Sequence, residues 1–153
     1  MAKFRFGLET LLRHREDIEQ KEQDELHRRT YRYQIELRNR DTLTARLQET
    51  RKELSLKQSE NALQKELDYY YRYCARLAHE IGESKKRLAQ LQTDVQLQRA
   101  VVIEASKNKK ILATMRKKKE REFMAAAEKQ EQKDIDELVA ARYTARERRT
   151  AGE

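Results

Sequence analysis

Three histidines are the side chains in this sequence that most readily suggest metal binding or catalysis. His14, His27 and His79 lie far apart, and none belongs to a cluster with metal-ligand spacing. The pair His79 and Glu80 begins like a zinc-protease helix, but position 83 holds Glu83 where the second histidine would be needed. The sequence also has no glycine-rich phosphate loop. We therefore expect no metal site, no cofactor and no catalytic residue.

The densest charge feature lies between residues 107 and 121. This segment holds eight basic residues and one acidic residue, Glu120, so its net charge of +7 accounts for nearly all of the chain's +8. The basic residues are Lys107, Lys109, Lys110, Arg116, Lys117, Lys118, Lys119 and Arg121. Such a run can be a solvated helix face, or it can attract an acidic protein, a nucleic acid or an anionic lipid. No base-reading fold accompanies it, so we expect no specific nucleic-acid recognition.

Four of the seven tyrosines fall within five residues, at Tyr69, Tyr70, Tyr71 and Tyr73. Tyr69 and Tyr73 are four residues apart, so on a helix they share a face and would form an aromatic surface patch. Exposed tyrosines can anchor a partner. The alternative is that they lie flat over the side of a neighbouring helix of the same chain.

These residues must be positioned by helices rather than by a thick globular core. The chain has 41% charged and 37% hydrophobic residues, no proline and only three glycines. Such a chain can fill a thin helix-to-helix seam but not a large interior. We expect an all-α fold, a long antiparallel two-helix coiled-coil hairpin with an overhanging C-terminal helix.

Apolar residues of the second half recur at alternating spacings of four and three, which indicates a heptad seam. Twelve of the fifteen seam positions are apolar or cysteine, and the positions are Leu63, Leu67, Tyr70, Cys74, Leu77, Ile81, Ser84, Leu88, Leu91, Val95, Gln98, Val102, Ala105, Lys109 and Leu112. The first half has a looser stripe, at Leu12, Leu26, Tyr33, Leu47 and Leu54, with Leu37 and Leu43 close beside it.

The two stripes predict two helices within a single domain over residues 1–153. We expect a first helix at about 5–55, a turn at about 56–61, where Ser55, Ser59 and Asn61 can compete with helix, and a second helix at about 62–147. A short connection favours antiparallel neighbours and a monomeric hairpin, in which Leu8 would lie roughly opposite Asn108. The alternative is one continuous helix that dimerises.

The sequence predicts a cytoplasmic protein. Cys74 has no partner for an internal disulfide. No apolar run is long enough to span a membrane, and the first fifteen residues lack the apolar stretch of a signal peptide.

Two end segments resemble the FliJ family of flagellar export proteins. The amino-terminal segment reads Phe4-Arg5-Phe6-Gly7-Leu8-Glu9-Thr10-Leu11-Leu12, followed by Arg15-Glu16, and the late segment reads Glu131-Gln132-Lys133-Asp134-Ile135-Asp136-Glu137. The resemblance implies a non-catalytic antiparallel coiled coil that serves the flagellar type III export apparatus, and hence motility and chemotaxis. It also implies three partners: the hexameric export ATPase, held as a central stalk is held in a rotary ATPase, the export gate in the membrane, and the export chaperones. The chain would then be peripheral on the cytoplasmic side of the cell membrane.

On this resemblance we assign two partner-binding sites. The site for the ATPase ring would comprise Phe4, Phe6, Arg116, Lys117, Lys118, Lys119, Asp136 and Glu137. The site for the export gate would comprise Tyr69, Tyr73 and Leu77. The alternatives are a stalk protein of an injectisome, whose opening motifs are similar, a basic coiled coil that binds nucleic acid, and a homodimeric structural rod.

Overall fold

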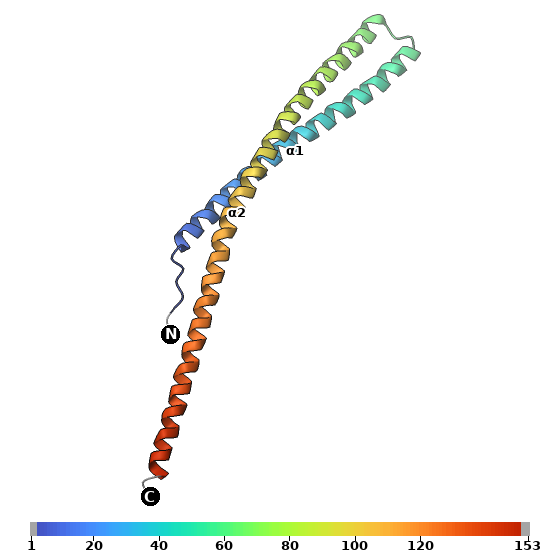
Figure 1. The fold of residues 1–153 in the computed structure, drawn as a ribbon. Coiled ribbons are helices and arrows are strands. Elements are labelled where there is room, and N and C mark those ends of the chain that lie inside the picture. Colours follow the sequence, from blue (N-terminus) through green and yellow to red (C-terminus); the bar gives the residue numbers. More distant parts are fainter. Residues whose placement is uncertain (1–2, 151–153) are drawn as a thin grey trace. The chain divides into compact units, whose positions relative to one another are not determined.

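The computed structural model describes residues 3–150, which form two helices and no strand. Helix α1 spans Glu9–Ser59 and helix α2 spans Gln64–Thr150, with 51 and 87 residues (Figure 1). The expected all-α fold with two long helices is therefore confirmed for the described residues. The connection occupies residues 60–63, later than the expected turn at 56–61.

The chain divides into two compact units. The hairpin unit consists of Ile18–Ala105, and the terminal unit consists of Met1–Asp17 together with Ser106–Glu153. That the whole chain behaves as a single domain stays a prediction.

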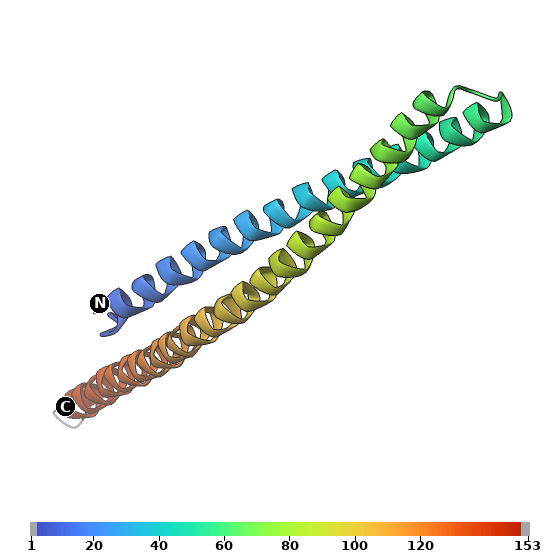
Figure 2. The same ribbon diagram turned by 90° about the horizontal axis from the view of Figure 1, so that it is seen from above.

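In the hairpin unit, the two helices lie side by side and run antiparallel (Figure 2). Every buried residue of α2 in this unit occupies a predicted seam position: Leu77, Ile81, Ser84, Leu88, Val95 and Gln98. Leu47 of α1 joins Leu77 and Ile81 in one core cluster, against which Tyr73 and Cys74 pack. Leu63 was expected in the seam but is 78% exposed, because it lies in the connection, just before α2 begins.

Helix α1 contributes a second heptad series that sequence reasoning missed, because its members are mostly polar. Glu22, Arg29 and Glu36 are spaced by seven residues, are half-buried and face α2. The Gln98 amide donates to a carboxylate oxygen of Glu22 at 2.6 Å, and the Arg29 guanidinium donates to the Asp94 carbonyl at 3.3 Å. These side-chain contacts tie one helix to the other at fixed positions.

The most buried of these polar contacts is centred on Glu36. The Ser84 hydroxyl, which is fully buried, donates to Glu36 Oε1 at 2.5 Å, and Arg87 Nη2 lies 3.0 Å from the same oxygen. The Ser84 hydrogen bond holds the pKa of the Glu36 carboxyl below its ordinary value, and Arg87 lowers it further against the opposing effect of burial. A charged Glu36 is thus stabilised in the seam, and no buried side-chain nitrogen or oxygen of the described residues lacks a hydrogen-bond partner.

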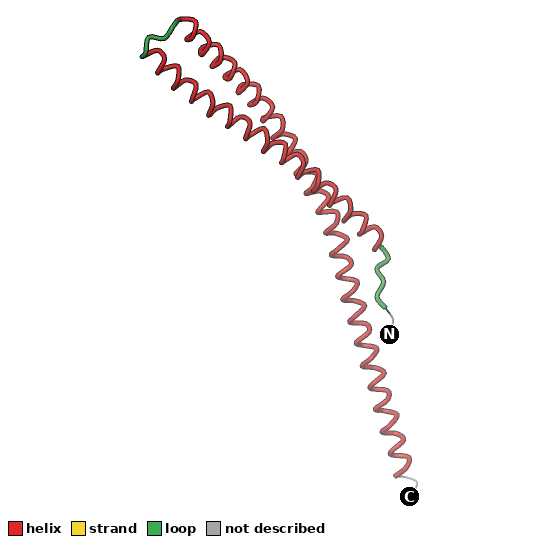
Figure 3. The backbone as a smooth tube through the Cα atoms, turned by 180° about the vertical axis from the view of Figure 1, so that it is seen from behind, coloured by secondary structure: helices red, strands yellow, loops and turns green. Residues whose placement is uncertain are grey.

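The connection, which Figure 3 draws as the loop between the two helices, closes α1 with a Schellman motif. The Ala62 N–H donates to the Lys57 carbonyl at 3.1 Å, and the Asn61 N–H donates to the Gln58 carbonyl at 3.3 Å. Asn61 has φ of 54°, in the left-handed region that asparagine tolerates better than most residues do. Asn61 therefore ends the first helix.

Gly82 offers a direct test of how α2 is packed. A Cβ atom added at this helical glycine would meet no heavy atom within 4 Å. Gly82→Ala should therefore stabilise the chain by about 0.5–1 kcal/mol, because alanine loses less backbone entropy on folding. Urea unfolding followed by circular dichroism measures this, and an unchanged or lowered midpoint would show that the space beside Gly82 is filled.

Glu36 makes stability depend on pH in acid. Because its folded pKa is lowered, its charged form stabilises the fold above the unfolded pKa, near 4.5, and this contribution disappears as pH falls through the folded pKa. Glu36→Gln keeps an acceptor for Ser84 but removes the charge, so it should cost about 1–2 kcal/mol at neutral pH and progressively less as pH falls through the folded pKa of Glu36. Urea titrations at several pH values measure the difference, with exposed Glu53→Gln as control. A difference that does not shrink in acid contradicts this account.

Candidate partner-binding surfaces

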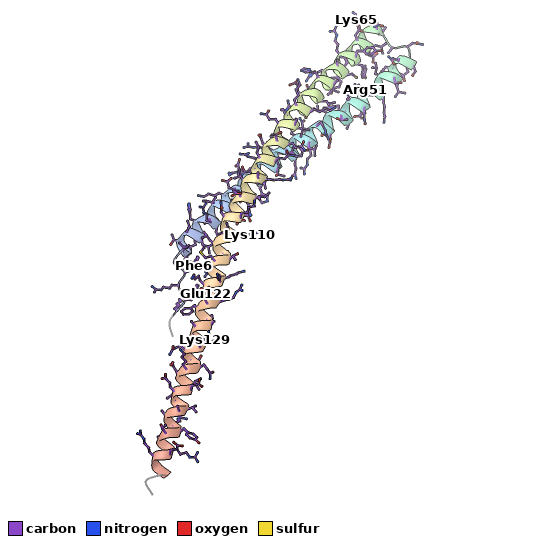
Figure 4. All side chains as sticks on the ribbon, viewed as in Figure 1. Phe6, Arg51, Lys65, Lys110, Glu122 and Lys129 are labelled. Atoms are coloured by element: carbon purple, nitrogen blue, oxygen red, sulfur yellow. The ribbon has the colours of Figure 1, made fainter. Side chains whose placement is uncertain are left out.

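The amino-terminal segment of the terminal unit is held against α2 by aromatic side chains. Phe4 and Phe6 are half-buried, and the ring of Phe4 lies 5.7 Å from the ring of Phe123. The Glu9 N–H donates to the Phe6 carbonyl at 3.2 Å, which leads the extended segment into α1. Figure 4 shows Phe6 near Glu122 of α2. Both line a depression of about 610 Å³ that also includes Leu8, Met115 and Lys119.

After the contact between Phe4 and Phe123, the two helices of the terminal unit pack through seam residues. Leu12 of α1 and Leu112 of α2 are both buried, as the sequence predicts. With the later turn, Leu8 lines a depression with Met115, so the expected pairing of Leu8 with Asn108 is displaced by about two helical turns.

The basic run contains residues in two different situations. Arg116 Nε lies 3.1 Å from Glu9 Oε2 of α1, and Lys119 Nζ lies 3.3 Å from Glu122 Oε2. Lys117 and Lys118 are exposed, and neither forms an ion pair with any residue that the structure describes. Four consecutive cations point in successive directions around a helix, at about 100° per residue. Arg116 thus holds the amino-terminal segment in place, whereas Lys117 and Lys118 remain available to a partner.

The tyrosines of the hairpin unit form the patch that their spacing predicts. The rings of Tyr69 and Tyr73 stack at 6.4 Å with an interplanar angle of 10°, and Tyr70 meets Tyr69 edge-on at 6.0 Å. The two stacked residues differ in burial. Tyr69 is 68% exposed, whereas Tyr73 is half-buried and packs against the core cluster. Tyr71 accepts a hydrogen bond from Gln58 Nε2 at 2.5 Å.

Leu77 does not belong to this surface. It is 3% exposed and packs with Leu47 and Ile81 in the core cluster, so its side chain cannot meet a partner while the hairpin is closed. We therefore remove Leu77 from the candidate gate site and assign it to the seam, where its heptad position also puts it.

The acidic candidates near the end of α2 lie on an exposed stretch. Every residue from 124 to 148 is exposed. Asp136 accepts a hydrogen bond from Gln132 Nε2 at 3.0 Å, and Glu137 is the next residue around the helix. The structure does not bring Asp136 or Glu137 next to Phe4, Phe6 or the basic run, since the aromatic contact ends at Phe123.

Sequence reasoning missed one group of surface residues. Ile135, Leu138, Val139 and Tyr143 are large, apolar and exposed. Their spacing of three and four residues was the available signal, but it starts well after the predicted seam ends at Leu112.

Potential metal ligands are dispersed among the described residues. No group of three or more His, Cys, Asp or Glu side chains among them could hold a metal ion. Cys74 is a half-buried free thiol packed against the core cluster.

Within residues 3–150, neither helix has a segment both long and apolar enough to cross a bilayer.

Comparison with known proteins assigns the family. No curated protein and no solved structure matches the chain. The sequence model of a family described as "Flagellar FliJ protein" matches residues 4–148, which is nearly the whole chain of 153 residues. The resemblance at the two end segments is confirmed by this match, and the chain belongs to the FliJ family.

Proposed function

We propose that this chain is a non-catalytic, stalk-like partner of the flagellar export ATPase, and that it links the ATPase and the export chaperones to the export gate. Membership of the FliJ family indicates a component of flagellar protein export. The finer proposal rests mainly on one observation: beside an anchored amino-terminal segment, Lys117 and Lys118 are exposed and form no ion pair within the described part of the chain.

The ATPase would bind the terminal unit through its positive charge. Lys117 and Lys118 would meet acidic loops of the ring, and Phe4 and Phe6 would shape the neighbouring surface. Attraction of this kind raises the association rate and is screened by salt over about 8–10 Å. Arg116 would act indirectly, because its contact with Glu9 fixes the segment that carries both phenylalanines.

The end of α2 would enter the ring as an overhang. Residues 124–148 are exposed, and Phe123 is the last described residue of α2 in contact with the amino-terminal segment. We place Asp136 and Glu137 on this unpaired part of the helix, which is about 35 Å long at 1.5 Å per residue. A single exposed helix of this kind can fit inside a ring that would exclude a wider domain.

The export gate would bind the hairpin unit at the tyrosine patch. Tyr69 presents its ring to solvent, and Tyr73 supports it from behind by stacking. This division of roles is typical of an anchor residue and its support. The chain would then be peripheral on the cytoplasmic side of the membrane, held there by the export apparatus. We assign no separate site to the chaperones.

The ATPase contact can be tested on the purified chain. Lys117→Gln with Lys118→Gln should reduce stimulation of the export ATPase severalfold at low salt and make the remaining stimulation less sensitive to salt. Steady-state ATP hydrolysis at rising salt concentration measures both effects. Lys85→Gln with Lys86→Gln, in the hairpin unit, removes the same charge and should leave stimulation nearly unchanged. If the two pairs behave alike, the basic run is only a solvated helix face.

The gate contact can be tested at a single tyrosine. Tyr69→Ala should weaken binding to the export gate by at least about 1 kcal/mol and leave the melting temperature unchanged, since Tyr69 is exposed. Tyr73→Ala should also lower the melting temperature, because Tyr73 packs on the core cluster. Tyr31→Ala, an exposed tyrosine on α1, is the matched control. Gate binding that survives Tyr69→Ala would remove this patch from the proposal.

A further inference from the structure

The exposed part of α2 carries an apolar centre on one side of the helix. Ile135, Leu138 and Val139 are 48%, 62% and 60% exposed. At about 100° per residue, Leu138 and Val139 lie about 60° and about 40° to either side of Ile135. This side is rotated by about 120° from Phe123, which packs on the amino-terminal segment, so the contacts of the terminal unit leave it uncovered.

Charged residues of opposite sign lie before and after this centre on the same side of the helix. Glu128 and Glu131 precede it, and both lie within about 40° of the direction of Ile135. Arg142 and Arg146 follow it, within about 20° of the same direction. The other charged residues from 124 to 148 lie about 100° or more away, and they are Lys129, Lys133, Asp134, Asp136, Glu137, Glu147 and Arg148. The two acids, the apolar centre and the two bases together form what we call the polarised face.

This order makes the polarised face complementary to a reversed copy of itself. When the apolar centres of two antiparallel copies meet, the helical spacing sets each acid of one copy against a base of the other. The facing pairs are Ile135 with Val139, Glu128 with Arg146 and Glu131 with Arg142, and two-fold symmetry forms each pair twice. A parallel pair would instead set acid against acid and base against base, which is unfavourable. The charge order therefore selects the antiparallel arrangement.

We infer that a second copy of this chain docks antiparallel on the polarised face, so that two exposed helix ends pair. The face holds two acids and two bases, so an anionic membrane would attract one end of it and repel the other. A uniformly acidic or basic protein groove has the same mismatch. The hairpin unit needs no second copy, because its seam is buried within one chain. This inference goes beyond the proposed function and does not depend on it.

The pairing is weak because the apolar centre is small. Three apolar side chains per copy bury less than the roughly 1,200 Å² of a stable specific interface, so we expect a Kd on the order of 100 µM. Asp136 lies at the edge of the face, where two copies bring two carboxylates near each other. Its hydrogen bond from Gln132 and its exposure to water limit this repulsion. Where α2 enters the ATPase ring as proposed above, pairing and entry exclude each other, because two helices are wider than one.

Sedimentation equilibrium of the full chain, from about 10 µM to about 1 mM, measures the pairing. The average mass of the wild-type chain should rise with concentration from 18.4 kDa towards twice that value. The rise should be severalfold weaker at about 500 mM than at about 50 mM salt, because salt screens the charged ends but not the apolar centre. A chain that stays monomeric throughout this range overturns the inference.

The apolar centre is tested by the centre variant, which carries Ile135→Gln, Leu138→Gln and Val139→Gln, since glutamine is a good helix former. It should associate at least about tenfold more weakly. Two matched controls should associate as the wild type does. Lys133→Gln with Glu137→Gln changes the back of the same helix, and Tyr31→Gln with Ile35→Gln removes exposed apolar residues of the hairpin unit. If either control weakens association as much as the centre variant does, the copies meet elsewhere and the inference falls.

Charge reversal tests the partner directly and does not depend on the centre variant keeping its helix. Glu128→Arg with Glu131→Arg makes the face wholly basic, and Arg142→Glu with Arg146→Glu makes it wholly acidic. Each variant alone should associate severalfold more weakly than the wild type at low salt, because like charges then face each other. An equal mixture of the two should associate at least as strongly as the wild type, since every facing pair is again of opposite sign. A mixture that remains monomeric overturns the inference.

A disulfide test reports the orientation of the pair. Ala127 and Ala145 lie on the same edge of the face, about 80° from Ile135, and an antiparallel pair brings one against the other. Under mild oxidation, Ala127→Cys mixed with Ala145→Cys should link one variant to the other, as mass spectrometry of the joined peptides shows. The wild-type chain, with Cys74 alone, is the control. Links of each variant to itself would show a parallel pair and overturn the inference.

Vesicles of phosphatidylglycerol separate a second copy from a lipid surface. The wild-type chain and the centre variant should bind them equally, because the inference gives lipid no part in covering the apolar centre. If the wild-type chain binds the vesicles and the centre variant does not, the apolar centre contacts lipid and the inference is overturned. None of these measurements includes the ATPase, so their failure leaves the proposed function untouched.

Discussion

The structure depends on the narrowness of the interface that two helices share. A helix pair buries one stripe from each partner, and every other side chain stays in water. In the hairpin unit this stripe is mostly apolar on the α2 side, apart from Ser84 and Gln98, and partly polar on the α1 side. The apolar half supplies most of the burial. The polar half, with Glu22 bound to Gln98 and Glu36 bound to Ser84, supplies contacts that exist only in one register, and a slip by one heptad would leave these groups unpaired.

The same constraint explains why the surfaces can be separated into distinct patches. With so little interior, a side chain off the seam either pairs with a neighbouring side chain of either helix or stays open to a partner. Arg116 and Lys117 are neighbours in sequence, yet one ties down Glu9 and the other is exposed without an ion partner among the described residues. Tyr73 and Tyr69 divide in the same way between the core cluster and solvent. The direction in which a side chain points from its helix therefore decides its role more than its residue type does.

The regularity of α2 is what made much of the fold predictable from sequence. Its apolar heptads predicted which residues are buried, from Leu77 to Gln98, because burial on one side of a helix leaves a periodic signature. The α1 seam was less visible, since Glu22 and Glu36 are half-buried and form hydrogen bonds to α2 that a hydrophobicity pattern cannot register. The turn was misplaced because Asn61, rather than a glycine, adopts the left-handed conformation. The candidate sites were less predictable still, because the sequence does not state the direction in which each residue of a cationic run points.

The angular position of each residue around its helix also limits how one slender chain can serve several partners at once. No residue is shared between Lys117 and Lys118, the tyrosine patch, and the apolar group of Ile135, Leu138, Val139 and Tyr143, and each of the three offers exposed side chains outside the seam. Their chemistry differs, since one is cationic, one is aromatic and one is apolar. Partners with different surfaces would therefore select different positions along the helices, and a change at one patch would leave the others intact. A two-helix chain without a large core can in this way be specific in several places, because each face of a helix is chemically independent of the face that holds the seam.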